Sequence, residues 1–228
     1  MLDNPPHSLL DLNNKNLPKF NIIKPQYDRS KLSPGIVHIG VGNFHRAHLS
    51  WYLHRLMQKN KNLDWGIIGS GVLNYDREMQ HKLKKQDFLT TLIELDPQGN
   101  KNCEIIGPMI DYASVESNNL SLINAMSDSR IRIVSLTVTE GGYFLDGENS
   151  DLDFTNPDIV NDINNPNSPK TVFGAIVYAL NIRRNNGHGP ITCLSCDNLI
   201  KNGDKLKQAV IGIAKNTNKD LSDWILEN

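Results

Sequence analysis

An apolar run passes directly into glycines at Gly35-Ile36-Val37-His38-Ile39-Gly40-Val41-Gly42. The run has the length of a buried strand, and the glycines that end it predict a tight turn. Residues 46–59 then place apolar side chains at the spacing of one helical face, and residues 65–69 fit a second strand. Strand, glycine turn, helix and strand together predict a βαβ unit.

The rest of the chain continues this alternation. Strand-like runs occupy residues 88–95, 103–110, 131–138 and 190–195, and helical patterns occupy residues 118–126, 171–184 and 204–214. Gly107-Pro108 predicts a break that divides residues 103–110 into two short strands. The pattern of residues 171–184 predicts an amphipathic helix, and the Asn-, Asp-, Ser- and Pro-rich residues 146–169 predict a long surface excursion.

Strands that alternate with helices favour an α/β fold with a Rossmann-like, doubly wound and mostly parallel sheet. We expect a polar N-terminal extension over residues 1–34 and one nucleotide-binding domain over residues 35–228. The 228 residues are enough for a sizeable core.

Composition and charge exclude several classes of partner. The formal net charge is -1, which gives no field that would attract nucleic acid or an anionic membrane. The N-terminal residues show no secretory signal, and no run of eighteen apolar residues occurs, so we expect a cytoplasmic protein. Three cysteines are too few for a disulfide framework, and Cys193-x-x-Cys196 lies in what the pattern predicts to be a buried strand rather than a redox or zinc site.

The glycine turn carries two of the three glycines of a dinucleotide fingerprint. Gly40 permits the tight turn, and Gly42 lets the backbone approach a pyrophosphate at the start of the helix. His45 occupies the place of the third glycine, which rules out the usual close packing of helix and strand. A glycine turn in an unrelated α/β protein is the alternative, because such motifs match by chance.

An acidic residue that binds the adenosine ribose is the next expected feature. Asp64 has the usual spacing from the glycines but precedes the second strand, whereas Asp76 follows that strand's end, where the ribose should lie. We therefore assign the ribose to Asp76 and read Asp64 as an ordinary turn residue. His45 and His48 lack a third ligand, so no metal site is expected.

Four separated motifs resemble the mannitol 2-dehydrogenase family of long-chain polyol dehydrogenases. They are Gly40-Val41-Gly42-Asn43-Phe44-His45-Arg46-Ala47-His48, Thr137-Val138-Thr139-Glu140-Gly141-Gly142-Tyr143, Pro169-Lys170-Thr171-Val172-Phe173-Gly174 and Ser195-Cys196-Asp197-Asn198-Leu199. Their order along the chain is more specific than any one of them. Tyr143 also suggests the catalytic tyrosine of short-chain dehydrogenases, but Gly147 stands where that class has its lysine.

The resemblance implies NAD as the cofactor and metal-independent chemistry. It implies that the glycine loop and Arg46 hold the phosphates, that Asp76 favours NAD over NADP, and that Asn198 faces the substrate. The predicted cofactor-binding residues are Ile39, Gly40, Val41, Gly42, Asn43, Phe44, His45, Arg46, Ala47, Asp76, Thr139, Glu140 and Gly141. A helix N-cap is the alternative role of Asn198.

The resemblance also implies a second, largely helical domain that carries a lysine general base in a Lys-x-x-x-x-Asn-x-x-His pattern. No such pattern occurs in the 228 residues, so we expect a cofactor-binding half that is inactive alone and has a missing C-terminal catalytic domain as its partner. The expected reaction interconverts a polyol, D-mannitol, and a ketose, D-fructose. A fructuronate or tagaturonate reductase relative is an alternative, but those hexuronate reductases usually carry a lysine where this chain has Gly141; a non-catalytic nucleotide-binding fragment is another.

Overall fold

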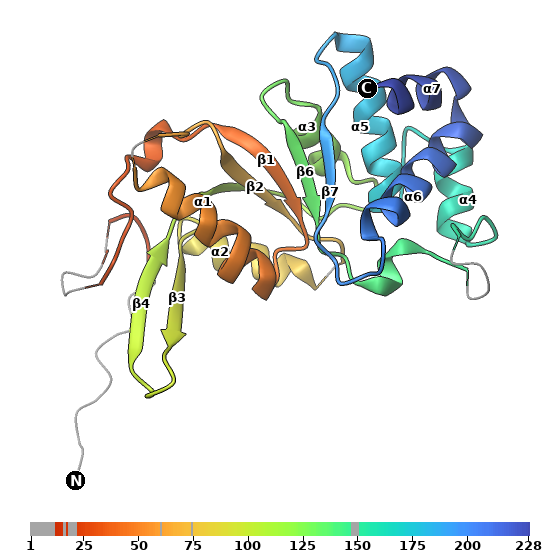
Figure 1. Ribbon diagram of the computed structural model, residues 1–228. Helices are drawn as coiled ribbons and strands as arrows, with labels where there is room; N and C mark the ends of the chain where they lie inside the picture. The colour runs from red at the N-terminus through yellow and green to blue at the C-terminus, as the bar shows by residue number, and fades with distance from the viewer. Residues whose placement is uncertain (1–11, 16, 18–21, 60, 74, 147–150) are drawn as a thin grey trace.

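Five parallel strands form the central sheet of the computed structural model, in the order β5-β2-β1-β6-β7. The structure describes residues 12–15, 17, 22–59, 61–73, 75–146 and 151–228. The strands are β1 (Pro34–Ile39), β2 (Gly66–Ser70), β5 (Met109–Ala113), β6 (Ile133–Leu136) and β7 (Thr192–Ser195). The strand order reverses at β1, since β2 lies on one side of it and β6 on the other, which confirms the Rossmann-like sheet (Figure 1).

Helices cover both faces of the sheet and bury a different side of β1 on each. Val37 and Ile39 belong to the larger core, whereas Ile36 belongs to the smaller one, because alternate side chains of a strand point to opposite faces. The larger core is closed by α3 (Leu120–Ser127), α5 (Val172–Asn186), α6 (Asn202–Thr217) and α7 (Lys219–Glu227). The smaller core is closed by α1 (Ser50–Met57) and α2 (Asp76–Lys85), on the other side of the molecule (Figure 1).

Helix α5 is buried on most of its circumference, so the prediction of an amphipathic helix was wrong. Small residues such as Ala175 and Ala179 let it pack between α3 and α6. Near its end, the buried Arg183 donates hydrogen bonds to five backbone carbonyls, those of Met126, Asp128, Ile131, His188 and Gly189. Arg183 is the only arginine among the fully buried side chains that the structure describes, and these bonds satisfy its hydrogen-bond donors.

The excursion after β6 contains a helix that the sequence pattern did not indicate. Helix α4 (Pro157–Asn164) begins at the N-cap Asn156, with proline at its first position. Its buried Asp162 accepts hydrogen bonds from the backbone N–H groups of Lys170 and Thr171 and so fixes the start of α5. Residues 147–150 of the excursion lie outside the described residues.

A β-hairpin stands apart from the central sheet. It consists of β3 (Thr90–Leu95) and β4 (Lys101–Ile106), paired antiparallel, and it projects away from the sheet (Figure 1). Gly107-Pro108 separates β4 from β5, as predicted. Within the N-terminal residues, Tyr27 is buried and its hydroxyl lies 2.9 Å from Nδ1 of His54, while Arg29 donates to the carbonyls of Gly107 and Met109.

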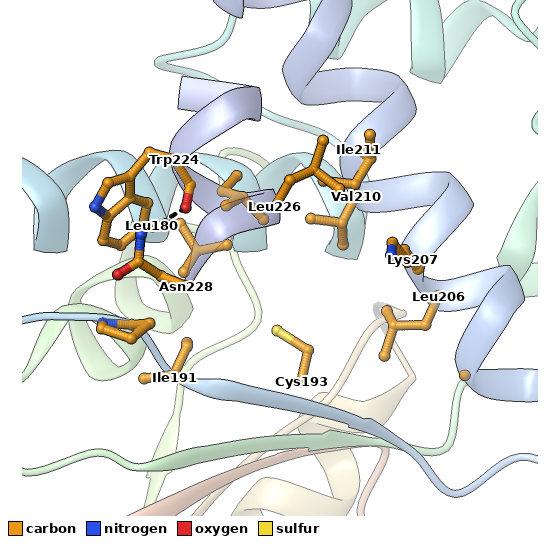
Figure 2. A pocket seen from close by; sticks show the side chains of 13 residues that line it. Leu180, Ile191, Cys193, Leu206, Lys207, Val210, Ile211, Trp224, Leu226 and Asn228 are labelled. Carbon is orange, nitrogen blue, oxygen red and sulfur yellow. Dashed lines mark hydrogen bonds between the residues drawn. The ribbon is translucent and has the colours of Figure 1, made fainter. Parts of the chain in front are cut away.

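Strand β7 is the edge of the sheet, exposes Thr192 and Leu194, and ends before Cys196, so the prediction that Cys193-x-x-Cys196 lies in a buried strand was wrong. Both cysteines are free and half-buried, and burial raises the pKa of the Cys193 thiol to about 11. Cys193 faces an apolar cavity of about 280 Å³ between β7, α6 and α7, lined also by Val210, Trp224 and Leu226 (Figure 2). None of the helices described is long and apolar enough to cross a membrane.

Candidate functional site

A cleft opens at the carboxyl ends of β1 and β6, the point at which the strand order reverses. Its volume is about 800 Å³, and its walls come from the glycine loop, the start of α2 and residues 137–142. A second cavity of about 470 Å³ is lined by Thr139, Glu140, Gly141, Asp197 and Asn198. Open parallel sheets bind their ligands in this position, and the volumes are those of small-molecule sites.

The two glycines of the loop differ in what surrounds them. Gly40 has a φ of +94°, and a Cβ atom there would overlap the carbonyl of Thr137, so only glycine fits. Around Gly42, the nearest atom to a built Cβ is the Gly40 carbonyl oxygen at 4.0 Å. Gly40 is therefore required by the protein's own packing, whereas Gly42 keeps a space open in the cleft. An open cradle after β1 fits a dinucleotide pyrophosphate.

The predicted loop residues divide into buried and accessible ones. Ile39 and Val41 are core side chains, so only their backbone can face the cleft. The exposed members are Gly42, Asn43, Phe44 and Ala47. Arg46 is half-buried and folds over the loop, donating to the Gly42 carbonyl at 3.3 Å and to Oδ1 of Asn43 at 2.7 Å. This position gives the loop a cation beside its free N–H groups.

His45 packs against β1 through its ring rather than through close backbone contact. Its imidazole stacks on that of His38, with ring centroids 4.4 Å apart, and residues His45–Leu49 form a π-helical turn. Burial, reinforced by His38 and Arg46, holds the pKa of His45 well below its usual value. Burial also lowers the pKa of His38 to about 4. Both rings are therefore neutral, which suits a structural role in place of the third glycine.

Asp76 lies at the edge of the cleft as the first residue of α2. One carboxylate oxygen, Oδ2, accepts hydrogen bonds from the N–H groups of Val72 at 2.7 Å and Leu73 at 2.9 Å. The other oxygen is not used in these two bonds. Asp64 lies beyond the cleft, at the amino end of β2, where it pairs with Arg132. Of the two aspartates, Asp76 is thus the one that lines the cleft with the glycine loop.

The turn after β6 depends on a carboxylate that sequence reasoning did not single out. Asp197 accepts hydrogen bonds from the N–H groups of Val138 at 3.2 Å and Thr139 at 2.9 Å, and from the Tyr143 hydroxyl at 2.9 Å. Tyr143 is fully buried, which accounts for its presence without a catalytic role. The only sequence signal was the position of Asp197, just past a strand end and beside Asn198.

Asn198 is exposed and lines the smaller cavity beside Thr139 and Gly141. Helix α6 begins after Lys201, which is its N-cap, so the alternative of Asn198 as that helix's cap was wrong. An exposed amide past the end of β7 can donate a hydrogen bond to an oxygen bound in the cavity.

The two loop histidines do not converge on a common point. His45 stacks on His38, whereas His48 stacks on Phe44. Across the residues that the structure describes, no group of three or more His, Cys, Asp or Glu side chains could hold a metal ion.

Comparison with known proteins agrees with this geometry. Residues 34–228 match the family model described as "Mannitol dehydrogenase Rossmann domain". Mannitol 2-dehydrogenase of Cereibacter sphaeroides is 50% identical over 205 residues, which cover 90% of this chain and 43% of that protein. Polyol:NADP oxidoreductase of Gluconobacter oxydans is 39% identical over 94% of this chain and 44% of that protein.

A solved structure extends the similarity to three dimensions. Pseudomonas fluorescens mannitol 2-dehydrogenase, in a ternary complex with NAD and D-mannitol, superposes with a TM-score of 0.89 at 40% identity. The match covers 96% of this chain and 45% of that one, so the chain spans less than half the length of these relatives. The chain belongs to the mannitol dehydrogenase family and comprises its Rossmann domain.

Proposed function

We propose that the chain is the NAD-binding part of a dehydrogenase that interconverts D-mannitol and D-fructose by hydride transfer. The observation that carries the proposal is the open cradle at Gly42, set where the strand order reverses. Family membership supports it, since relatives that match almost the whole chain are named mannitol 2-dehydrogenases.

The residues of the cleft take distinct roles in this proposal. Backbone N–H groups after Gly42 and the Arg46 side chain bind the pyrophosphate, because helix N-termini and guanidinium groups both favour phosphate oxygens. The free oxygen of Asp76 accepts a hydrogen bond from the adenosine ribose. Thr139, Glu140 and Gly141 line the nicotinamide side, next to Asn198.

The chemical step needs a hydride acceptor, an oriented alcohol and a proton acceptor. Bound NAD supplies the hydride acceptor. Asn198 orients the reacting oxygen by donating a hydrogen bond that strengthens as negative charge develops on that oxygen. We propose that the acceptor of the alcohol proton lies outside these 228 residues, since the expected lysine pattern does not occur in them. The chain alone should then show no mannitol-dependent reduction of NAD.

Titration of the chain with NADH tests the cofactor assignment. Energy transfer from the tryptophans to bound NADH should saturate for the natural chain. Gly42→Asp should weaken binding by at least roughly a hundredfold, because it places a carboxylate against the pyrophosphate, and each factor of ten is about 1.4 kcal/mol. The protein's own packing leaves room for the Cβ atom of the new side chain, since the nearest atom to a Cβ built at Gly42 lies 4.0 Å away.

Gly203→Asp is the matched control. It adds the same charge at an exposed position in the first turn of α6, where a built Cβ meets nothing within 4 Å. This variant should bind NADH as the natural chain does. Equal binding by Gly42→Asp and Gly203→Asp would remove the glycine loop from the cofactor site.

A further inference from the structure

Asp197 is buried at the end of β7 yet contacts no cation among the interactions described for its side chain. Only 9% of its surface is exposed, and its carboxylate instead accepts three neutral hydrogen bonds. Two of the donors are consecutive backbone N–H groups of the turn after β6, about sixty residues earlier in the chain. A carboxylate suits this set because it has acceptors alone, whereas an amide would turn an NH₂ group toward one of the donors.

Thr139, one of the residues that Asp197 holds, has an unusual backbone conformation. Its φ is 65° and its ψ is 166°, a region that is populated almost only by glycine. A β-branched residue stays there only when its surroundings impose the conformation. The hydrogen bond from the Thr139 N–H to Oδ1 of Asp197 is the long-range contact that does so directly.

Asp197 is itself held through both its side chain and its backbone. The Tyr143 hydroxyl bonds to Oδ2 of Asp197 and lies 2.5 Å from Oγ of Ser195, in the strand that precedes Asp197. The side-chain amide of Asn202 donates hydrogen bonds to the backbone carbonyls of Ser195 and Asp197. Hydrogen bonds thus connect β7, α6 and the turn after β6 beside the smaller cavity.

We propose that Asp197 is a positioning residue that holds Thr139 in its glycine-like conformation and thereby shapes the nicotinamide side of the cofactor site. The inference rests on the proposed function. Thr139 and Asp197 line the same cavity as Asn198, so a turn that relaxed at Thr139 would change the walls on which the nicotinamide lies. On the adenosine side, Gly42 and Asp76 make none of the hydrogen bonds of Asp197, so that side should not respond.

Comparison of two ligands separates the two sides. NADH contains the nicotinamide, whereas ADP-ribose ends before it. Asp197→Asn should weaken NADH binding by about tenfold, the equivalent of one charge-assisted hydrogen bond, and leave ADP-ribose binding within about twofold. Asp204→Asn, which neutralises an exposed carboxylate in the first turn of α6, should change neither.

A second substitution tests whether Asp197 acts through residue 139. Glycine adopts the Thr139 conformation without strain. In a Thr139→Gly background, Asp197→Asn should therefore weaken NADH binding by less than about threefold, compared with about tenfold in the natural chain. Tyr143→Phe removes one donor to Asp197 and should reproduce the loss of NADH binding in smaller measure.

Four outcomes are decisive. Loss of NADH and ADP-ribose binding together in Asp197→Asn would make Asp197 a general structural residue and overturn the proposal. An equal loss of NADH binding in the natural chain and in the Thr139→Gly background would overturn it too. So would a loss of NAD⁺ binding without a loss of NADH binding, because it would indicate that Asp197 attracts the positive charge of the oxidised nicotinamide. Failure of the natural chain to bind either ligand would instead reject the proposed function itself.

Discussion

The two sides of the cleft are held in shape by different kinds of contact. On the adenosine side, the two hydrogen bonds of Asp76 to Val72 and Leu73 join residues close in sequence. On the nicotinamide side, Asp197 holds Val138 and Thr139 across 59 and 58 residues. Both sides use one carboxylate that accepts two consecutive backbone N–H groups, but only the first does so locally.

Each side also contains a residue whose positive φ is unfavourable for most side chains, Gly40 on one side and Thr139 on the other, and the two residues meet this requirement in different ways. Gly40 meets the requirement through its lack of a side chain, whereas Thr139 meets it under constraint from Asp197. The adenosine side should therefore be sensitive to an added side chain, and the nicotinamide side to loss of a distant partner.

The largest effect is expected from Gly40→Ala. A left-handed alanine costs about 1–2 kcal/mol, and overlap with the Thr137 carbonyl adds about 1–3 kcal/mol, so the free energy of unfolding should fall by about 3 kcal/mol. Gly141→Ala is the control, because a Cβ there meets nothing within 4 Å, and it should change stability by less than about 0.5 kcal/mol. Urea unfolding of both variants gives the comparison; similar losses would mean that the loop conformation does not depend on Gly40.

An intermediate effect is expected from Asp76→Asn, which removes the negative charge but keeps the hydrogen bonds from the N–H groups of Val72 and Leu73. Both loop N–H groups bond to Oδ2 alone, so the single oxygen of asparagine can replace it. Binding of NADPH relative to NADH should rise by about tenfold, since the carboxylate no longer repels the 2′-phosphate. Glu78→Gln, in the first turn of the same helix and in the same cleft, is the control. An equal rise there would assign the selectivity to the negative charge at the start of α2 rather than to Asp76 itself.

The smallest effect is expected from the buried histidines beside the glycine loop. In the unfolded chain they bind protons near pH 6.5, whereas burial lowers the pKa of His38 to about 4 and that of His45 well below its usual value. The unfolded state thus binds more protons as the pH falls below about 6.5, and stability decreases with it. His45→Leu should reduce this decrease by about 1 kcal/mol at pH 6, measured by urea unfolding from pH 7.5 to pH 5.

His48→Leu, on the exposed part of the same helix, is the matched control for the loss of an imidazole. A slope that is the same for His45→Leu as for the natural chain would show that His45 is not held neutral by burial.

Most local features of this molecule were predictable from sequence, helix α4 excepted, and the long-range ones were not. The strand and glycine turn at Gly40, the position of Asp76 after β2 and the break at Gly107-Pro108 each depend on neighbours within a few residues. Helix α4 was missed because Asn156-Pro157, its start signal, lies in a segment whose polar composition resembles a loop. The sites of Asp197 and Tyr143 depend on contacts that only the folded chain creates.

The π-helical turn at His45–Leu49 has an evolutionary consequence. A π-turn holds one residue more than the α-turn that it replaces, so it can accommodate one inserted residue while both ends of the helix stay in place. One end is fixed by the glycine loop and the other by His54, which contacts Tyr27 and Glu104. In homologues without the insertion, a sequence alignment should place a one-residue gap in this helix, and a small residue should stand in place of His45.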